Sequence, residues 1–552
     1  MFKLLAFLLR VSPSTVILAI VASVLAGVGN TALLAVITNQ LSKGEHSGTS
    51  LVIGFIGLCV VMLGSRAASM ILLTRLTLTS TLNLRMRLSR QILSTPLRDL
   101  EKLGEARLLT SLTDDVPVIT VALSTVPILA MNAAIVTGCL SYLGWLSWKL
   151  LIGVLVYMIV GAAIYQFAIL KASRFVRLAR ESAEALMNNL RALTDATKEL
   201  KIHQKRREVF LTDMLEASAV NLQRHNMMAN VIFISNAILG QALIFALIGL
   251  LLFGLSGVIS VSAQILTSYT VMMLYMMGPL ESLLNSLPNF NRAVVAMQKV
   301  NQLGISLAQK SSENEIAGKK LSTTGWESLE LINATHTYYR ENQENSFMLG
   351  PINMQIEAGE ILFLTGGNGS GKTTLAKLIL GLYAPETGQV KLNGEDITDE
   401  NRESYRQYFS VVFTDFYLFD SLIGLDQTGL DERAQKYLSM LQLDKVVEVK
   451  DGKLSTIRLS QGQRKRLALL TAYLEDRPIY LFDEWAADQD PLFKEVFYYQ
   501  LLPELKSRGK TVIVISHDDH YYHVADRVVK LDYGQIEYDQ YSTGLRKMPA
   551  SI

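Results

Sequence analysis

The chain has 552 residues, of which half are hydrophobic and 18% are charged, and its formal net charge is +2. A soluble protein carries about 25% charged residues, so this composition, with a mean hydropathy of +0.26, argues against a wholly soluble protein. The near-neutral charge gives no general attraction to nucleic acid, and we predict no nucleic-acid partner. Cys59 and Cys139 lie in apolar stretches without metal-ligand spacing, which predicts small buried side chains rather than a disulfide.

Six apolar segments follow one another in the first half of the chain. Each has about 20 or more predominantly apolar residues, enough to cross a hydrocarbon core of about 30 Å. They are 15–41, 51–75, 117–144, 149–170, 230–256 and 261–287. The first is too long for the apolar core of a signal peptide, so we expect it to be retained as a membrane span.

Basic residues divide the loops between these segments into two kinds. The loop after the second segment holds six basic residues, from Arg85 to Arg107, and the loop after the fourth holds ten between Lys171 and Arg207 alone. The other loops hold at most one each. Because basic loops stay on the cytoplasmic side, both termini and these two loops are predicted to be cytoplasmic. The two loops contain few helix breakers, so we expect them to extend the membrane helices rather than to be loose tethers.

Two charged residues lie within the apolar segments away from the segment ends, Arg66 in the second and Glu281 in the sixth. Such residues are costly in lipid and usually face protein or water. They either line a cavity in the membrane or serve packing between helices, with Arg66 reaching along its own helix. The sixth segment also carries four methionines, which suit either a cavity for varied apolar shapes or ordinary core filling. These are Met272, Met273, Met276 and Met277.

A polar stretch, 309–325, separates this half from the next and is interpreted as a linker. Further on, a predicted buried strand runs into GGNGSGKTT and then into an apolar helix. This is Gly-x-x-x-x-Gly-Lys-Thr between a strand and a helix, where backbone amides and the helix N-terminus wrap phosphates. We expect Lys372 to contact the β- and γ-phosphates of ATP and Thr373 to hold Mg²⁺. The phosphate-binding set is Gly366, Gly367, Asn368, Gly369, Ser370, Gly371, Lys372, Thr373 and Thr374.

A second apolar strand, predicted over 479–483, ends in two carboxylates. Asp483 is the candidate ligand on the Mg²⁺ side, and Glu484 is the candidate general base that faces the attacking water. His517 follows another predicted strand, 511–516, and can reach the γ-phosphate from there. A metal site within 517–520 is the alternative, which the nucleotide interpretation makes unnecessary.

The segment Ser460-Gln461-Gly462-Gln463 opens an apolar helix and offers a further anion-binding N-terminus. It resembles the signature motif of ATP-binding cassette transporters, although that family usually has Gly in place of Gln461. In the family, the signature of one subunit closes over ATP bound to the other. The resemblance therefore implies a homodimer, with Tyr338, or else Tyr339, stacked on adenine and 487–490 crossing the dimer.

One stretch departs from the family. Where a Gln usually stands the chain has Thr414, followed by Asp415, whose carboxylate could replace the Gln as a contact of Mg²⁺. The variants GGNGSGKTT, VVFTDFYLFD, LSQGQRKR, DEWAADQDP and ISHDDHYY look like the branch that exports cyclic peptides, lasso-type microcins and siderophore precursors such as pyoverdine. Trp485, where most relatives carry a small residue, is the most particular of these marks.

The resemblance covers nearly the whole chain and implies an architecture. We expect an all-α transmembrane domain with six spans over 1–308, the linker 309–325, and an α/β P-loop ATPase domain over 326–552. The expected function is ATP-driven export of a peptide-type secondary metabolite across the bacterial inner membrane, with Arg66 and Glu281 in the substrate cavity. A lipid or lipopeptide flippase and a non-transporting membrane ATPase are the alternatives. Import is disfavoured, because importers of this superfamily usually keep the membrane and ATPase parts on separate chains.

Overall fold

The computed structural model of the protein describes residues 13–43, 49–254, 262–310, 321, 325–338, 347–425 and 428–541. The chain divides into two compact units: Met1–Arg85 with Ser111–Val300, and Met86–Thr110 with Asn301–Ile552. The second unit therefore includes a short segment that lies within the predicted membrane half. Most of the predicted linker lies outside the described residues, as do Tyr339 and residues 255, 256 and 261 of the predicted spans.

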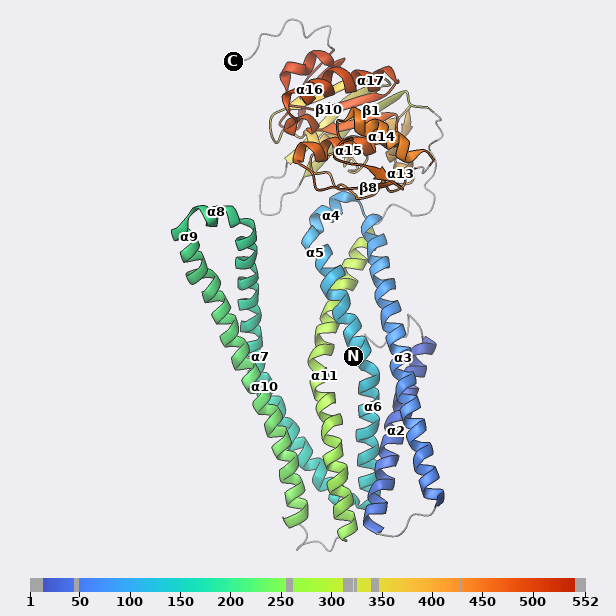
Figure 1. Ribbon diagram of the computed structural model, residues 1–552, viewed down its shortest axis with the longest axis vertical. Helices are drawn as coiled ribbons and strands as arrows, with labels where there is room; N and C mark the ends of the chain where they lie inside the picture. Colours follow the sequence, from blue (N-terminus) through green and yellow to red (C-terminus); the bar gives the residue numbers. More distant parts are fainter. Residues whose placement is uncertain are drawn as a thin grey trace. The chain divides into compact units, whose positions relative to one another are not determined.

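The first unit is built from long helices (Figure 1), and each of the six predicted spans falls on one of them. The helices are α2 (Pro13–Lys43), α3 (Thr49–Leu93), α6 (Val116–Leu146), α7 (Trp148–Asp195), α10 (Ala217–Gly249) and α11 (Ala263–Lys310). Helices α3 and α7 continue well beyond the predicted spans, which confirms that the basic loops extend the helices. Short elements link them, namely η1 (Ser111–Asp115), α8 (Thr197–Ile202), α9 (Gln204–Val209), η2 (Phe210–Glu216) and η3 (Leu250–Gly254).

Four helical stretches in the described part of the chain are long and apolar enough to cross a membrane. They are Pro13–Gln40, Thr49–Leu93, Arg107–Leu146 and Gln204–Phe253. A shorter apolar helix, Trp148–Ile164, coincides with the predicted fourth span, and α11 is not among the four. The membrane character of the unit is thus clear, while the count of six spans stays a prediction.

Helices α2 and α6 pack closely because small residues face each other. A Cβ atom added to Gly27 would lie 2.6 Å from the Cβ atom of Ala134. One added to Gly138 would lie 2.7 Å from the Oγ1 atom of Thr31. Close approach through small residues is the usual way for helices to associate in lipid, where burial of apolar surface gives no driving force.

The methionines of the sixth predicted span contribute to an apolar core. Met272, Met273 and Met276 are at most 3% exposed and pack with residues of α6, α7 and α10. Cys139 is buried in the same cluster and is a free thiol. Tyr269 is fully buried there, and its hydroxyl lies within hydrogen-bonding distance of the Leu143 and Ser147 carbonyls. For these methionines the structure favours core filling over a cavity lining.

The described residues of the second unit form two larger sheets and one two-stranded sheet. A six-stranded sheet has the order β12-β11-β3-β10-β9-β6, in which only β12 runs antiparallel to its neighbour. Its strands are β3 (Ile361–Gly366), β6 (Phe409–Val412), β9 (Ile479–Asp483), β10 (Thr511–Ile515), β11 (Arg527–Asp532) and β12 (Gln535–Tyr541). An antiparallel sheet has the order β2-β1-β4-β5, from β1 (Ser328–Tyr338), β2 (Phe347–Glu357), β4 (Thr387–Leu392) and β5 (Glu395–Asp396). The strands β7 (Val449–Lys450) and β8 (Lys453–Leu454) form a separate pair.

Both faces of the six-stranded sheet are covered, so its central strands read as continuous apolar runs. Phe363, Tyr480 and Phe482 belong to one buried cluster, and Leu364 and Leu481 to another. The covering elements lie around the strands in Figure 1. They are α12 (Lys372–Ile379), α13 (Arg402–Arg406), α14 (Leu430–Met440), α15 (Gln461–Glu475), η4 (Trp485–Asp488), α16 (Pro491–Val496), η5 (Phe497–Leu501), α17 (Leu502–Ser507) and η6 (Asp519–Val524).

The segment 86–110 joins this unit through two short helices, α4 (Leu97–Leu103) and α5 (Glu105–Thr110). Leu97 packs against the cluster that includes α12 and β4. Arg98 forms an ion pair with Glu386 at 2.5 Å. These contacts account for the grouping of a segment from the predicted membrane half with the ATPase half.

Candidate nucleotide site

The phosphate loop connects β3 to α12, which confirms the predicted strand–loop–helix context. Gly366 has φ +141°, and a Cβ atom there would collide with the carbonyl oxygen of Leu531. Gly371 has φ +102° and caps the N-terminus of α12. Glycine is needed at both positions, since other residues rarely adopt such angles. The loop thus directs backbone amides and a helix N-terminus to one place, as anion binding requires.

Lys372 is the first residue of α12 and is only 5% exposed. Its Nζ atom donates to the carbonyl oxygens of Gly366 and Gly367 at 2.9 and 3.0 Å. Burial lowers the pKa of Lys372, and the nearby carboxylates of Glu484 and Asp483 oppose this shift. The ammonium is therefore held at the rim of the loop, where a phosphate would replace the two carbonyls as its partner.

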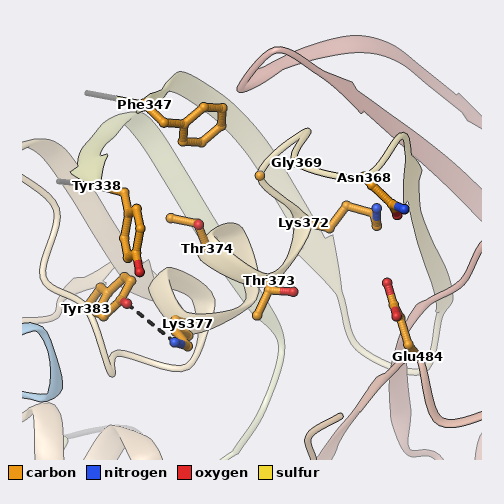
Figure 2. Close-up of a pocket in the computed structure, with 11 residues that line it drawn as sticks. Tyr338, Phe347, Asn368, Gly369, Lys372, Thr373, Thr374, Lys377, Tyr383 and Glu484 are labelled. Carbon is orange, nitrogen blue, oxygen red and sulfur yellow. Dashed lines mark hydrogen bonds between the residues drawn. The ribbon is translucent and has the colours of Figure 1, made fainter. Parts of the chain in front are cut away.

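A cavity of about 440 Å³ lies against the loop. Figure 2 shows Tyr338 and Tyr383 on one side of it and Lys372 and Glu484 on the other. This separation gives the cavity an aromatic end and a charged end, which suits a base at one and phosphates at the other. Its lining is Tyr338, Phe347, Asn368, Gly369, Gly371, Lys372, Thr373, Thr374, Lys377, Tyr383 and Glu484.

Glu484 follows β9 directly and has φ +50°, a left-handed conformation that is uncommon for a residue other than glycine. Its Oε1 atom lies 3.0 Å from Nε2 of His517. The two residues come from the ends of neighbouring parallel strands, β9 and β10, which explains why residues 33 positions apart meet. The two predicted catalytic residues, Glu484 and His517, are thus in contact with each other, and Glu484 lines the cavity.

Asp483 is 2% exposed, and its Oδ1 atom has no hydrogen-bond partner among the described residues. Burial, with a further contribution from Glu484, raises the pKa of Asp483 to about 6. Thr414 donates from Oγ1 to the Asp483 carbonyl oxygen at 3.0 Å, so the stretch that departs from the family does lie beside this carboxylate. Asp415 is exposed and close enough to add to the shift in the pKa of Asp483. Lys372 acts on Asp483 in the opposite direction, but the neighbouring carboxylates and burial outweigh it, so a divalent cation would stabilise the ionised Asp483.

The segment 460–463 begins α15, as predicted. Ser460 Oγ accepts from the Gln463 backbone at 3.4 Å, and Gln463 Oε1 accepts from the Ser460 backbone at 3.2 Å, which forms a capping box. Among the described residues, none of Ser460, Gln461, Gly462 and Gln463 lines the cavity beside the phosphate loop. The anion-binding end of α15 therefore forms no part of the lining of this chain's own nucleotide cavity.

Three residues that line the cavity were not predicted from the sequence: Phe347, Lys377 and Tyr383. Lys377 lies four residues after Thr373 on the same helix face, so helical periodicity could have found it. Phe347 and Tyr383 come from distant parts of the chain and carry no local signal. Lys377 and Tyr383 also hold α4, because Glu101 accepts from Lys377 Nζ at 2.8 Å and from the Tyr383 hydroxyl at 2.5 Å.

Among the described residues, the two candidates for a membrane cavity, Arg66 and Glu281, form no ion pair with each other. Arg66 and Glu281 occupy exposed positions on different helices, α3 and α11. Their role in a substrate cavity stays a prediction.

Comparison with known proteins decides the family. Residues 14–280 match the ABC transporter transmembrane region and residues 349–487 match the ABC transporter domain. Over 524 residues the chain is 37% identical to the ATP-binding protein SyrD of Pseudomonas syringae pv. syringae, covering 93% of this chain and 92% of SyrD. The chain belongs to the ABC transporter family. This ABC transporter has fused membrane and ATPase parts and couples the hydrolysis of ATP, with Mg²⁺, to export across a bacterial membrane.

Other relatives of this ABC transporter are more distant. It is 26% identical over 484 residues to the ATP-dependent lipid A-core flippase of Pasteurella multocida, covering 82% of this chain and 79% of the flippase. It is 25% identical over 290 residues to the transport/processing ATP-binding protein ComA of Streptococcus pneumoniae, covering 49% and 38% of the two chains. A solved bacterial Atm1-family ABC exporter with ATP bound superposes with a TM-score of 0.73 at 15% identity, covering 98% of this chain and 96% of the other. That likeness establishes the ABC exporter fold.

The residues present fit the nucleotide and its metal. Besides Asp483 Oδ1, the Ser370 Oγ atom is buried without a hydrogen-bond partner among the described residues. Buried polar atoms are normally paired, so both are suited to ligand atoms. The cavity, the loop amides and Lys372 provide for a nucleoside triphosphate, and Thr373 and Asp483 are the residues that would hold Mg²⁺.

Proposed function

We propose that this transporter exports a peptide-type secondary metabolite, such as a cyclic or lasso peptide or a siderophore precursor, across the bacterial inner membrane. The observation that supports this cargo is the 37% identity to SyrD over nearly the whole chain, against 26% to a lipid A-core flippase. The unusual Trp485, which belongs to the motif set of the peptide-exporting branch, supports the same choice. The basic loops favour an orientation with both termini and the ATPase domain in the cytoplasm.

We propose further that the working unit is a homodimer. The supporting observation is that, among the described residues, those of 460–463 line no part of the chain's own nucleotide cavity. A second copy would bring its Ser460, Gln461, Gly462 and Gln463 to the phosphates and complete two composite sites. Closure of the cassettes would then depend on ATP as the shared ligand.

In the proposed chemistry, Glu484 takes a proton from the water that attacks the γ-phosphorus atom. His517, 3.0 Å from the Glu484 carboxylate, holds that carboxylate and contacts the γ-phosphate. Lys372 neutralises charge on the β- and γ-phosphates, and Tyr338 stacks on the base. Thr373, Asp483 and, in our proposal, Asp415 would hold Mg²⁺, which would supply positive charge to the phosphate oxygens when bound.

The substitution Glu484→Gln tests the assignment of the base. It removes the proton acceptor but keeps the shape of the side chain, so ATP binding should persist while turnover falls by about 10² to 10⁴. The full-length protein in nanodiscs should then accumulate as an ATP-bound closed dimer, measured by the distance between spin labels on the two cassettes. Turnover close to that of the unchanged protein would refute the assignment.

Cargo is tested by transport in sealed inverted vesicles that contain the full-length protein. Peptide cargo predicts ATP-dependent uptake of cyclic or lasso peptides, and none in vesicles that carry Glu484→Gln. The flippase relatives make movement of lipid or lipopeptide the second candidate. ATPase stimulation by lipid A variants but not by peptides would support that candidate and reject peptide export. ATP turnover without movement of either class would support a non-transporting ATPase.

A further inference from the structure

A buried lysine in α15 has no role in the site described above. Lys465 is 1% exposed, and its Nζ atom donates to the backbone carbonyl oxygen of Glu484 at 3.1 Å. The same atom forms an ion pair with Asp488 at 2.8 Å. An ammonium group is costly to bury, so it is retained only where its partners are fixed. Here those partners are the residue assigned as the base and the short helix η4 that follows it.

Glu484 needs such partners because its left-handed backbone is uncommon and strained. Its backbone N–H donates to the Ile515 carbonyl at 3.1 Å. Its carbonyl accepts from Lys465 and, at 3.3 Å, from the Ala487 backbone. Its carboxylate meets His517. Of these contacts, the one with Lys465 is made by a side chain to the backbone of Glu484, so a substitution can remove it without altering the strands.

Trp485 makes a second connection between α15 and η4. Its Nε1 atom donates to the Lys465 carbonyl oxygen at 2.8 Å. The ring is 1% exposed and stacks on Phe497, with ring centroids 4.5 Å apart. The residue after the base is therefore fixed both by packing and by a hydrogen bond to the same lysine. This gives the unusual tryptophan a physical role.

The neighbouring residues extend these ties to the start of α15. Arg466 donates from Nε to Gln489 at 3.0 Å and from Nη2 to Asp490 at 2.5 Å. Gln489 donates in turn to the Gly462 carbonyl oxygen at 3.2 Å. The helix that begins with the signature motif and the backbone that carries Glu484 thus form one connected piece. A shift of α15 would be passed to the Glu484 backbone through Lys465.

We propose that Lys465 is a positioning residue for Glu484 and that Trp485 supports it in this role. By holding the Glu484 backbone, Lys465 fixes the distance from the Glu484 carboxylate to the attacking water. This inference rests on the proposed role of Glu484 as the general base. It concerns the rate of the chemical step and not the affinity for ATP, because Lys465 is not among the residues that line the nucleotide cavity. A displacement of about 1 Å in such a group can cost as much as 10²-fold in rate.

The test uses the full-length protein in nanodiscs and measures kcat and KM for ATP. Lys465→Met keeps the length of the side chain and removes the donor, so kcat should fall at least about tenfold while KM changes less than about twofold. Trp485→Phe keeps an aromatic ring beside Phe497 but removes the indole N–H donor together with part of the ring system, and should lower kcat by a smaller factor at unchanged KM. Lys506→Met breaks a more exposed Lys–Asp ion pair, with Asp526 at 2.6 Å, away from the site and serves as the control for the loss of such a pair.

A double variant separates positioning from simple charge compensation. Lys465→Met leaves Asp488 without its cation, and adding Asp488→Asn removes that imbalance. We expect the double variant to regain thermal stability but not kcat. Recovery of kcat in the double variant, or a kcat in Lys465→Met within about twofold of the unchanged protein, would overturn the positioning role.

The variants Glu484→Gln and Lys465→Met distinguish a wrong assignment of the base from a wrong positioning role. If Glu484→Gln hydrolyses ATP normally, the assignment of the base is wrong and the positioning role of Lys465 falls with it. If Glu484→Gln is inactive while Lys465→Met turns over normally, only the positioning role is wrong. Should Lys465→Met fail to fold, an unchanged kcat in Trp485→Phe would overturn the proposed support by Trp485.

Discussion

The attachment of α4 to the ATPase domain should depend on one carboxylate. Glu101 accepts two hydrogen bonds, from Lys377 at 2.8 Å and from Tyr383 at 2.5 Å. Burial, together with the bond to Glu101, raises the pKa of Tyr383 far above its usual value, so the hydroxyl stays a donor at any working pH. We therefore choose Glu101→Gln, which keeps the shape and removes the charge.

The free energy that α4 loses in Glu101→Gln can be worked out from these contacts. A hydrogen bond to a charged group is worth about 1.5 to 3 kcal/mol when well buried. The side chains of Glu101 and Lys377 are 33% and 24% exposed, so solvent screens the pair toward the value of about 1 kcal/mol typical of surface pairs. Glutamine can still accept from Tyr383, which leaves a net loss of about 1 to 2 kcal/mol. That loss corresponds to a local opening of α4 about five- to thirtyfold more frequent.

Hydrogen exchange of the full-length protein in nanodiscs measures this opening. The Gly104 N–H, which bonds to Leu100, reports on α4, and its protection should fall by the factor given above. The matched control is Glu105→Gln in α5, a residue for which no ion pair occurs within the described part of the chain. Unchanged protection over 97–103 in Glu101→Gln, or an equal loss in Glu105→Gln, would refute the reasoning.

Two glycines give further predictions. Gly366→Ala should lower the affinity for ATP at least about tenfold, because its Cβ atom would collide with the Leu531 carbonyl and distort the phosphate loop; unchanged binding of a fluorescent ATP analogue would contradict this. Gly27→Leu should destabilise the membrane unit by about 1 to 3 kcal/mol, since its Cβ atom would lie 2.6 Å from Ala134. Thermal unfolding in detergent measures the effect. Gly57→Leu is the control that should leave the unfolding midpoint unchanged, because a Cβ atom added at Gly57 would meet no neighbouring side chain or helix within 4 Å.

Much of the ATPase fold was predictable from the sequence because its motifs are local. The strand before the phosphate loop, the strand ending at Asp483 and the helix opened by Ser460 all occur where predicted. Each rests on a run of neighbouring residues whose apolar pattern and breakers fix the element. The long helices of the membrane half follow from the same kind of signal.

The contacts that the sequence did not reveal all join distant residues. Glu101 meets Lys377 across 276 positions, and neither residue stands in a stretch that predicts the other. In the sequence, nothing distinguishes Lys465 from the basic residues on either side of it, although in the structure it is buried against the Glu484 backbone. Tertiary packing alone decides such pairs, as it also decides that the segment 86–110 groups with the ATPase half.

The two faces of the six-stranded sheet differ in the kind of side chain that they bury. One face is rich in aromatic rings, including Phe363, Tyr480 and Phe482, while the other is mostly aliphatic, with Leu364 and Leu481. A strand buried on both faces can slip by one residue at little cost if the faces are alike. Here a slip of β9 would force rings into the space shaped for leucine and isoleucine. The difference in side-chain size thus selects one alignment during folding, and with it the positions of Asp483 at the end of β9 and of Glu484, which lines the nucleotide cavity.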